Sequence, residues 1–257
     1  MKRNCMPLFL LIVFWISSCH TGLQRQTGPF VSGSVYYAII DSIPVPEGYT
    51  RLDQAPGSFG YWLREIPVKK DKTVYLFNGQ KKRNQSAQFA VLDIPVGNQD
   101  LQQCADAVMR LRAQYLFDNK KYDSICFYDN NGTAYRWKGG NNAAQFEPYL
   151  EKVFSYCGSA SLEKQLMPAG DIRKVLPGEV LIRGGFPGHA MMVVDVAENK
   201  KGERVYLLAQ SYMPAQDIHI VVNPEEESIS PWYQASGTGN YIITPEWHFL
   251  PSQLRKW

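Results

Sequence analysis

The feature that most constrains the fold is a change of hydrophobic period near the middle of the chain. Between residues 101 and 117, apolar side chains recur every three or four positions, a spacing that predicts an amphipathic helix. Asn98 and Asp100 precede this run and are candidate N-caps. A weaker helical pattern covers residues 146–156.

Most of the other patterned segments are typical of short strands. They are rich in Val, Ile, Leu and aromatic residues and are bounded by Gly, Pro or Asn. The predicted strands cover residues 74–77, 88–94, 178–182, 189–196, 204–212, 217–222 and 240–244. Strands outnumber helices and the main helix precedes most of them, which predicts an α+β fold with one main helix packed on an antiparallel β-meander.

The N-terminus has the pattern of an export signal. Lys2 and Arg3 precede an uncharged apolar run, which ends at Ser17-Ser18-Cys19. This order is typical of a signal peptide, and the run is too short to span a bilayer. Residues 16–19 resemble a bacterial lipobox, which implies cleavage after residue 18 and lipidation of Cys19. An ordinary secretory signal with an incidental cysteine is the alternative.

Three segments are therefore expected: a signal peptide over 1–18, a lipidated flexible tether over 19–43, and a single domain over 44–257. Without Lys2 and Arg3, the chain carries 25 basic against 24 acidic residues. This balance argues against nucleic acid as a partner, because phosphate binding needs a clustered basic excess.

Three cysteines remain after the anchor: Cys104, Cys126 and Cys157. At least one is unpaired unless an intermolecular bridge forms, and the sequence leaves open whether Cys126 bonds to Cys157. No cysteine or histidine spacing is typical of zinc. The cysteine chemistry considered below needs no metal or other cofactor, so none is expected.

Two stretches could carry chemistry. Cys104 lies near the start of the predicted helix, where the helix dipole and free N–H groups lower a thiol pKa. His189 begins a predicted strand after the glycine-rich run 184–188. If the following hairpin pairs Asn199 with Gly202, Gln210 lies diagonal to His189 on the same sheet face. These residues supply a nucleophile, a base and a group that orients the base.

The runs Pro177-Gly178-Glu179-Val180, Gly188-His189-Ala190-Met191 and Leu208-Ala209-Gln210-Ser211 resemble the core of NlpC-type papain-like cell-wall peptidases. The resemblance covers residues 100–212 and implies that Cys104 is the nucleophile, His189 the base and Gln210 the orienting residue. The Cys104 backbone N–H, with Asn98 or Gln103, would stabilise the oxyanion.

This chain departs from that family beside the nucleophile. Gln103 replaces the usual Asp, Ala105-Asp106 replaces Ser-Gly, and Gln210 replaces the commoner His. These differences keep open a catalytically inactive papain-like module that binds cell-wall peptides or envelope partners. An acyltransferase on the same scaffold is a third alternative.

The mature chain also resembles a family of uncharacterised Bacteroidetes lipoproteins. That likeness is carried by the segments Ser58–Arg64, Asp100–Arg112, Gly185–His189 and Ala209–Asp217. Together, these patterns predict a cysteine hydrolase or amidase that acts on peptidoglycan peptides. The membrane is an expected partner through the lipid, and the expected location is the periplasmic face of the outer membrane.

Overall fold

The computed structural model describes Met1 and residues 36–236 and 239–257. The predicted signal peptide, the lipidation site at Cys19 and the tether up to residue 35 lie outside the described residues. Within the described chain, no helix is both long and apolar enough to cross a membrane.

The folded unit extends from Tyr36 to Trp257. Ile40 and Ile43 are completely buried in its core. The folded chain therefore begins before residue 44, the start expected from the sequence, because these two side chains are anchored by the core rather than left in a tether.

Helices and strands alternate irregularly along the chain. The α-helices are α1 (Phe59–Arg64), α2 (Cys104–Asp118), α3 (Phe146–Tyr156) and α4 (Ser159–Gln165). The 3-10 helices are η1 (Ile40–Ser42), η2 (Tyr122–Ser124), η3 (Ala143–Gln145), η4 (Ile172–Lys174) and η5 (Pro251–Gln253). The strands are β1 (Tyr49–Arg51), β2 (Gln88–Val91), β3 (Cys126–Tyr128), β4 (Ala134–Arg136), β5 (Met167–Pro168), β6 (Val180–Arg183), β7 (His189–Asn199), β8 (Arg204–Gln210), β9 (His219–Val221), β10 (Tyr233–Gln234), β11 (Ile242–Ile243), β12 (His248–Phe249) and β13 (Leu254–Lys256).

A large antiparallel sheet organises the molecule. Its strand order is β2-β9-β8-β7-β6-β13-β5, with β1 paired to β7 and β10 paired to β8. Two small hairpins, β3-β4 and β11-β12, complete the described strands. The predicted mixed α+β architecture with a large antiparallel sheet is confirmed.

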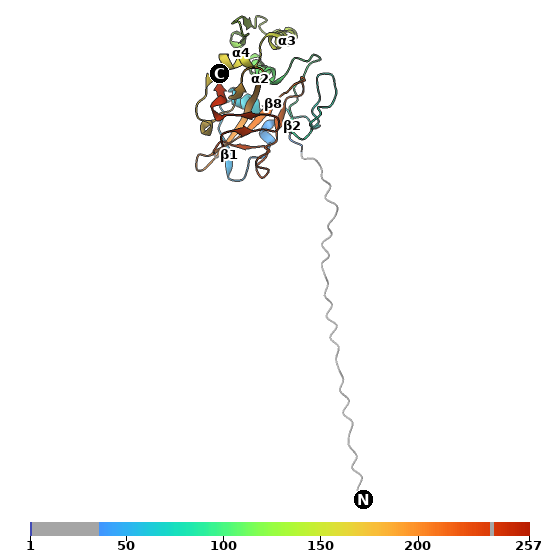
Figure 1. Ribbon diagram of the computed structural model, residues 1–257, viewed down its shortest axis with the longest axis vertical. Helices are drawn as coiled ribbons and strands as arrows, with labels where there is room; N and C mark the ends of the chain where they lie inside the picture. Colours follow the sequence, from blue (N-terminus) through green and yellow to red (C-terminus); the bar gives the residue numbers. More distant parts are fainter. Residues whose placement is uncertain (2–35, 237–238) are drawn as a thin grey trace. The chain divides into compact units, whose positions relative to one another are not determined.

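The two faces of the sheet are covered differently. Helix α2 packs on β7 and β8, and α3 and α4 pack on α2, so the helices gather on one side (Figure 1). Ala190, Met192 and Val194 of β7 belong to this helix-side core. Met191 and Val193 point to a second core on the other face, which also includes Phe249 of β12.

Helix α3 covers the predicted residues, whereas α2 begins three residues later than predicted. Neither Asn98 nor Asp100 caps α2. The N-cap is Gln103, and its backbone N–H donates to the Asp106 carboxylate over 3.0 Å. Cys104 is consequently the first residue of the helix.

The register of the β7–β8 hairpin differs from the predicted one near its turn. The predicted register pairs Glu198 with Glu203, whereas the structure pairs Glu198 with Arg204. A β-bulge between Val193 and Asp195 then shifts the pairing back by one residue. Beyond the bulge, Met192 pairs with Ala209, which is the pairing predicted for the end of the hairpin near His189.

The bulge also reverses the face of Asp195. Strict alternation along β7 would put Asp195 on the same face as His189, but the extra residue turns its carboxylate towards α1. There it accepts hydrogen bonds from Arg51 at 2.7 Å and from Arg64 at 2.6 Å.

Candidate functional site

Cys104 lies at the N-terminus of α2 and is buried, with 9% of its surface exposed. The backbone N–H groups of Cys104, Ala105 and Ala190 are directed at its thiol and act to lower its pKa. Burial outweighs them and raises the pKa of Cys104 to about 11. The predicted net lowering of this pKa is therefore wrong, because the helix N-terminus is itself packed against β7.

A buried carboxyl group lies beside the thiol on the same helix. Burial holds the pKa of Asp106 well above its usual range, although the Gln103 backbone N–H acts to lower it. A negative charge on Asp106 would raise the pKa of Cys104 further. Protonation of Asp106 removes this contribution, so burial is the main cause of the high thiol pKa.

His189 is the first residue of β7, and its ring is enclosed by aromatic side chains. The ring centroids of Tyr212, Trp247 and Phe249 lie 5.0, 5.4 and 5.8 Å away. Burial lowers the pKa of His189 to about 4; the hydrogen bond with Gln210 acts to raise this pKa, and the positive charge of Lys82 acts to lower it. His189 is therefore a neutral imidazole at pH 7.

Gln210 orients this imidazole. His189 Nε2 lies 2.8 Å from Gln210 Oε1. Gln210 Nε2 donates to Glu246 Oε2 over 2.8 Å and also contacts His219 Nε2 at 3.3 Å. The Glu246 carboxylate only accepts hydrogen bonds, so it fixes which end of the Gln210 amide faces His189.

The amide orientation determines the tautomer of His189. Because Gln210 Oε1 only accepts, His189 Nε2 carries the proton and Nδ1 keeps a free lone pair. Lys82 extends the network through an ion pair with Glu246, with 2.5 Å between Nζ and Oε2. The structure therefore brings His189 and Gln210 together in the predicted pair and adds Glu246, Lys82 and His219.

Tyr212 connects this network to the cysteine. Its ring contacts His189, and its pKa is raised by burial first and then by the charges of Glu246 and Cys104. The Ala190 N–H, next to His189 in the chain, is directed at the Cys104 thiol. Cys104 and His189 thus lie at one locality, where α2 meets the start of β7.

The two predicted oxyanion residues have different positions. Asn98 is exposed, and its side chain forms no hydrogen bond within the described part of the chain. The Gln103 side chain lies beside Cys104, but its Nε2 donates to Asp100 Oδ1 over 3.1 Å. Of the two, the structure brings only Gln103 to the cysteine.

A cavity of about 270 Å³ opens beside Cys104. Its walls come from the start of α2, the Cys157–Ser159 segment, the Gly185–Gly188 loop and Met213. Phe186 is 98% exposed at the tip of this loop. The cavity gives a ligand access to the region around the thiol.

All three cysteines of the described chain are free, so the structure contains no Cys126–Cys157 disulfide. Cys157 lines the same cavity as Cys104, and burial raises its pKa to about 12. In residues 36–236 and 239–257, no three His, Cys, Asp or Glu side chains form a group able to hold a metal ion.

The fold and this site define a mixed α+β protein in which a buried His–Gln pair at the ends of the central strands β7 and β8 lies near a buried Cys at the start of α2. The chain belongs to the family described as "Domain of unknown function (4846)", whose model matches residues 39–142 and 135–256. No curated protein and no solved structure matches the chain.

Proposed function

We propose that this chain is a cysteine hydrolase or amidase with a papain-like, NlpC-type core, tethered to the cell envelope as a Bacteroidetes-type lipoprotein. Its substrates are peptidoglycan peptides. The observation that carries the proposal is the hydrogen bond between His189 Nε2 and Gln210 Oε1. It leaves the Nδ1 lone pair of His189 without a hydrogen-bond partner among the described residues, and this nitrogen is the proposed acceptor of the Cys104 proton.

The proposed reaction uses the neutral pair. Cys104 Sγ attacks the carbonyl carbon of an amide as its proton passes to His189, and the Cys104 backbone N–H supports the oxyanion. The C–N bond then breaks, and the imidazolium returns the proton to the leaving amine. In the second step His189 takes a proton from water, the resulting hydroxide attacks the thioester and the C–S bond breaks. The acid is released, and the imidazolium returns the proton to Cys104 Sγ. Gln210 is the positioning residue for His189.

The location follows from the N-terminal pattern. A lipid at Cys19 would hold the domain at the membrane through the tether, within reach of peptidoglycan. The proposed face is the periplasmic side of the outer membrane, and an envelope protein is the other partner class that this tether would favour.

One observation favours a catalytically inactive binding module as the second candidate. Burial raises the pKa of Cys104 to about 11, so the thiolate is a small minority at pH 7. A binding module would keep the cavity and the oriented histidine without using the thiol as a nucleophile.

Digestion of purified peptidoglycan by the full mature chain separates the two candidates. A hydrolase releases new amino termini, which chromatography detects, and Cys104→Ser abolishes their release. Cys126→Ser is the matched control and keeps wild-type release. If wild type releases no amine while it binds the polymer, the binding module replaces the hydrolase. Transfer of an acyl group to an added amine instead of water would indicate acyltransferase chemistry.

A further inference from the structure

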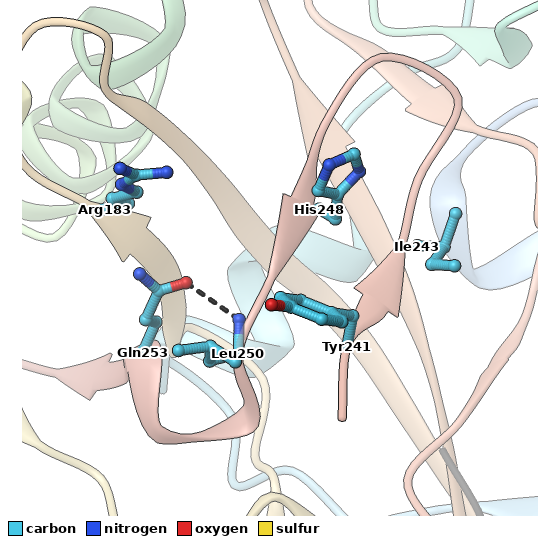
Figure 2. Close-up of a pocket in the computed structure, with 6 residues that line it drawn as sticks. All are labelled: Arg183, Tyr241, Ile243, His248, Leu250 and Gln253. Carbon is cyan, nitrogen blue, oxygen red and sulfur yellow. Dashed lines mark hydrogen bonds between the residues drawn. The ribbon is translucent and has the colours of Figure 1, made fainter. Parts of the chain in front are cut away.

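A second cavity lies beside the site, on the face of the sheet opposite α2. Its volume is about 710 Å³, and it is formed by the end of β6, the β11–β12 hairpin and the segment that contains η5 (Figure 2). Its lining residues are Arg183, Tyr241, Ile243, His248, Leu250 and Gln253.

The strand register places this cavity next to His189. Arg183 is the direct cross-strand partner of His189 in the β6–β7 pair. Directly opposed side chains share a face, with Cβ atoms about 5 Å apart. Phe249, which lies between the lining residues His248 and Leu250, packs its ring 5.8 Å from that of His189.

The cavity is cationic and rich in hydrogen-bond donors. Arg183 is exposed and forms no salt bridge within the described residues. Gln253 Oε1 accepts from the Leu250 backbone N–H over 2.8 Å, which leaves Gln253 Nε2 as a donor. Figure 2 shows Arg183 and Gln253 on one side of the opening, with the Tyr241 hydroxyl directed towards Gln253.

An anion with an apolar portion fits this chemistry. A guanidinium presents paired N–H donors that match the two oxygens of a carboxylate. No acidic side chain is among the described lining residues to compete for Arg183. Ile243, Leu250 and the Tyr241 ring supply apolar contact for the rest of the ligand.

The β6–β7 hairpin borders both cavities. Gly185–Gly188 line the Cys104 cavity, whereas Arg183 lines the second one. The two ends of this loop lie close together: a Cβ atom added to Gly188 would lie only 2.8 Å from the carbonyl oxygen of Arg183. An extended peptide gains about 3.4 Å per residue, so a ligand of a few residues can contact both sides of the hairpin.

We propose that the Arg183 cavity is a binding subsite for a carboxylate of an acidic peptide, so that the enzyme selects peptides with a negative charge near the amide bond held at Cys104. This selectivity rests on the proposed function. The binding site itself does not, because it requires Arg183 and its cavity but no reaction at the thiol.

The test is calorimetric titration of the Cys104→Ala full mature chain, which binds without turnover. The probes are acetyl-Ala-Glu-Ala as the free acid and acetyl-Ala-Gln-Ala-amide, which has nearly the same shape without charge. Glutarate is a third probe that carries carboxylates without a peptide. Arg183→Gln removes the cation, and Arg173→Gln is the matched control because Arg173 is exposed outside the cavity and paired with Asp171.

The acidic peptide should bind at least about tenfold tighter than the amide, because a charged hydrogen-bonded pair contributes enough for a factor of that order. Arg183→Gln should remove this preference, and Arg173→Gln should keep it. Equal binding of the two peptides, or a preference that survives Arg183→Gln, would overturn the proposal. Glutarate binding as tight as that of the acidic peptide would overturn the peptide assignment.

This titration, together with the digestion of peptidoglycan by wild type, separates this inference from the proposed function. A peptide preference through Arg183 with an inert Cys104 in wild type would leave the subsite standing and reject the hydrolase. Amide hydrolysis at Cys104 without any preference for the acidic peptide would reject the subsite alone.

Discussion

Acid should destabilise this protein through a histidine buried in the Gln210 network. His219 is completely buried, and burial, reinforced by the charge of Lys82, lowers its pKa to about 3. In the unfolded chain the pKa of a histidine is about 6.5. The unfolded state therefore binds more protons below pH 6.5, and the stability that His219 provides above that pH is lost as the pH falls towards 3.

The size of the effect follows from this difference in pKa. One bound proton changes the free energy of unfolding by about 1.4 kcal/mol per pH unit, so His219 should account for a loss of about 2 kcal/mol between pH 7 and pH 5. His189, whose pKa is about 4, should contribute a similar loss over this interval. Buried carboxyl groups such as Asp106 act in the opposite direction, so the test compares variants rather than the total change.

Urea unfolding at pH 7 and pH 5 measures this linkage in wild type and His219→Gln. The variant should lose about 2 kcal/mol less than wild type between these pH values. His248→Gln, which removes an exposed histidine, should lose as much as wild type. Equal losses in wild type and His219→Gln would refute the reasoning. If His219→Gln does not fold, an NMR titration of the wild-type His219 ring replaces it, and protonation above pH 5 would be the contrary result.

Three further predictions concern stability and the site. Asp195→Ala should cost about 3 kcal/mol in urea unfolding, because it leaves the buried Arg64 and the partly buried Arg51 with only the more exposed Asp41 carboxylate. Asp171→Ala, at an exposed ion pair, should change stability far less, and equal effects would contradict this. Gly178→Ala should cost about 2–5 kcal/mol because φ is +89° and the new Cβ would lie 2.6 Å from the Phe59 ring. Gly79→Ala, with φ of +79° and no atom within 4 Å of the new Cβ, should cost only about 1–2 kcal/mol, and a similar loss at both positions would exclude the steric explanation. Gln210→Ala should slow alkylation of Cys104 about tenfold or more, measured by peptide mapping, because His189 loses its orienting partner; an unchanged rate would show that Gln210 does not position the base.

The helices were predictable because their apolar side chains recur at helical spacing. Even the weaker pattern over residues 146–156 predicts the bounds of α3, because its buried side chains form one apolar stripe. Strands β5, β10 and β13 have two or three residues each. Periodicity cannot identify segments of that length, because they become strands only through pairing partners that are distant in the sequence.

The register at the site was predicted correctly, although the turn that leads to it was not. The longer turn and the bulge after Val193 shift the pairing in opposite directions, so Met192 still faces Ala209. A bulge has no reliable local sequence signal in a uniformly apolar strand. The same irregularity turns Asp195 to the face opposite His189, which alternation along the strand does not indicate.

The pairing of His189 with Gln210 was within reach of the sequence, but the rest of the network was not. Glu246 is 36 residues from Gln210 and 164 from Lys82. His219 had no sequence neighbour that indicated a partner, yet strand pairing places it opposite Gln210. The high pKa of Cys104 also depends on tertiary burial, which the helical pattern alone does not determine.

The central claim, that His189 activates Cys104, is tested most directly by the rate of Cys104 alkylation with iodoacetamide, resolved by mass spectrometry of each cysteine peptide. Cys157 is the internal control, because it is a buried free thiol in the same cavity. Cys104 should react at least about a hundredfold faster than Cys157 at pH 7, and His189→Ala should remove most of that advantage. Equal reactivity of the two thiols, or a Cys104 rate unchanged by His189→Ala, would contradict the account.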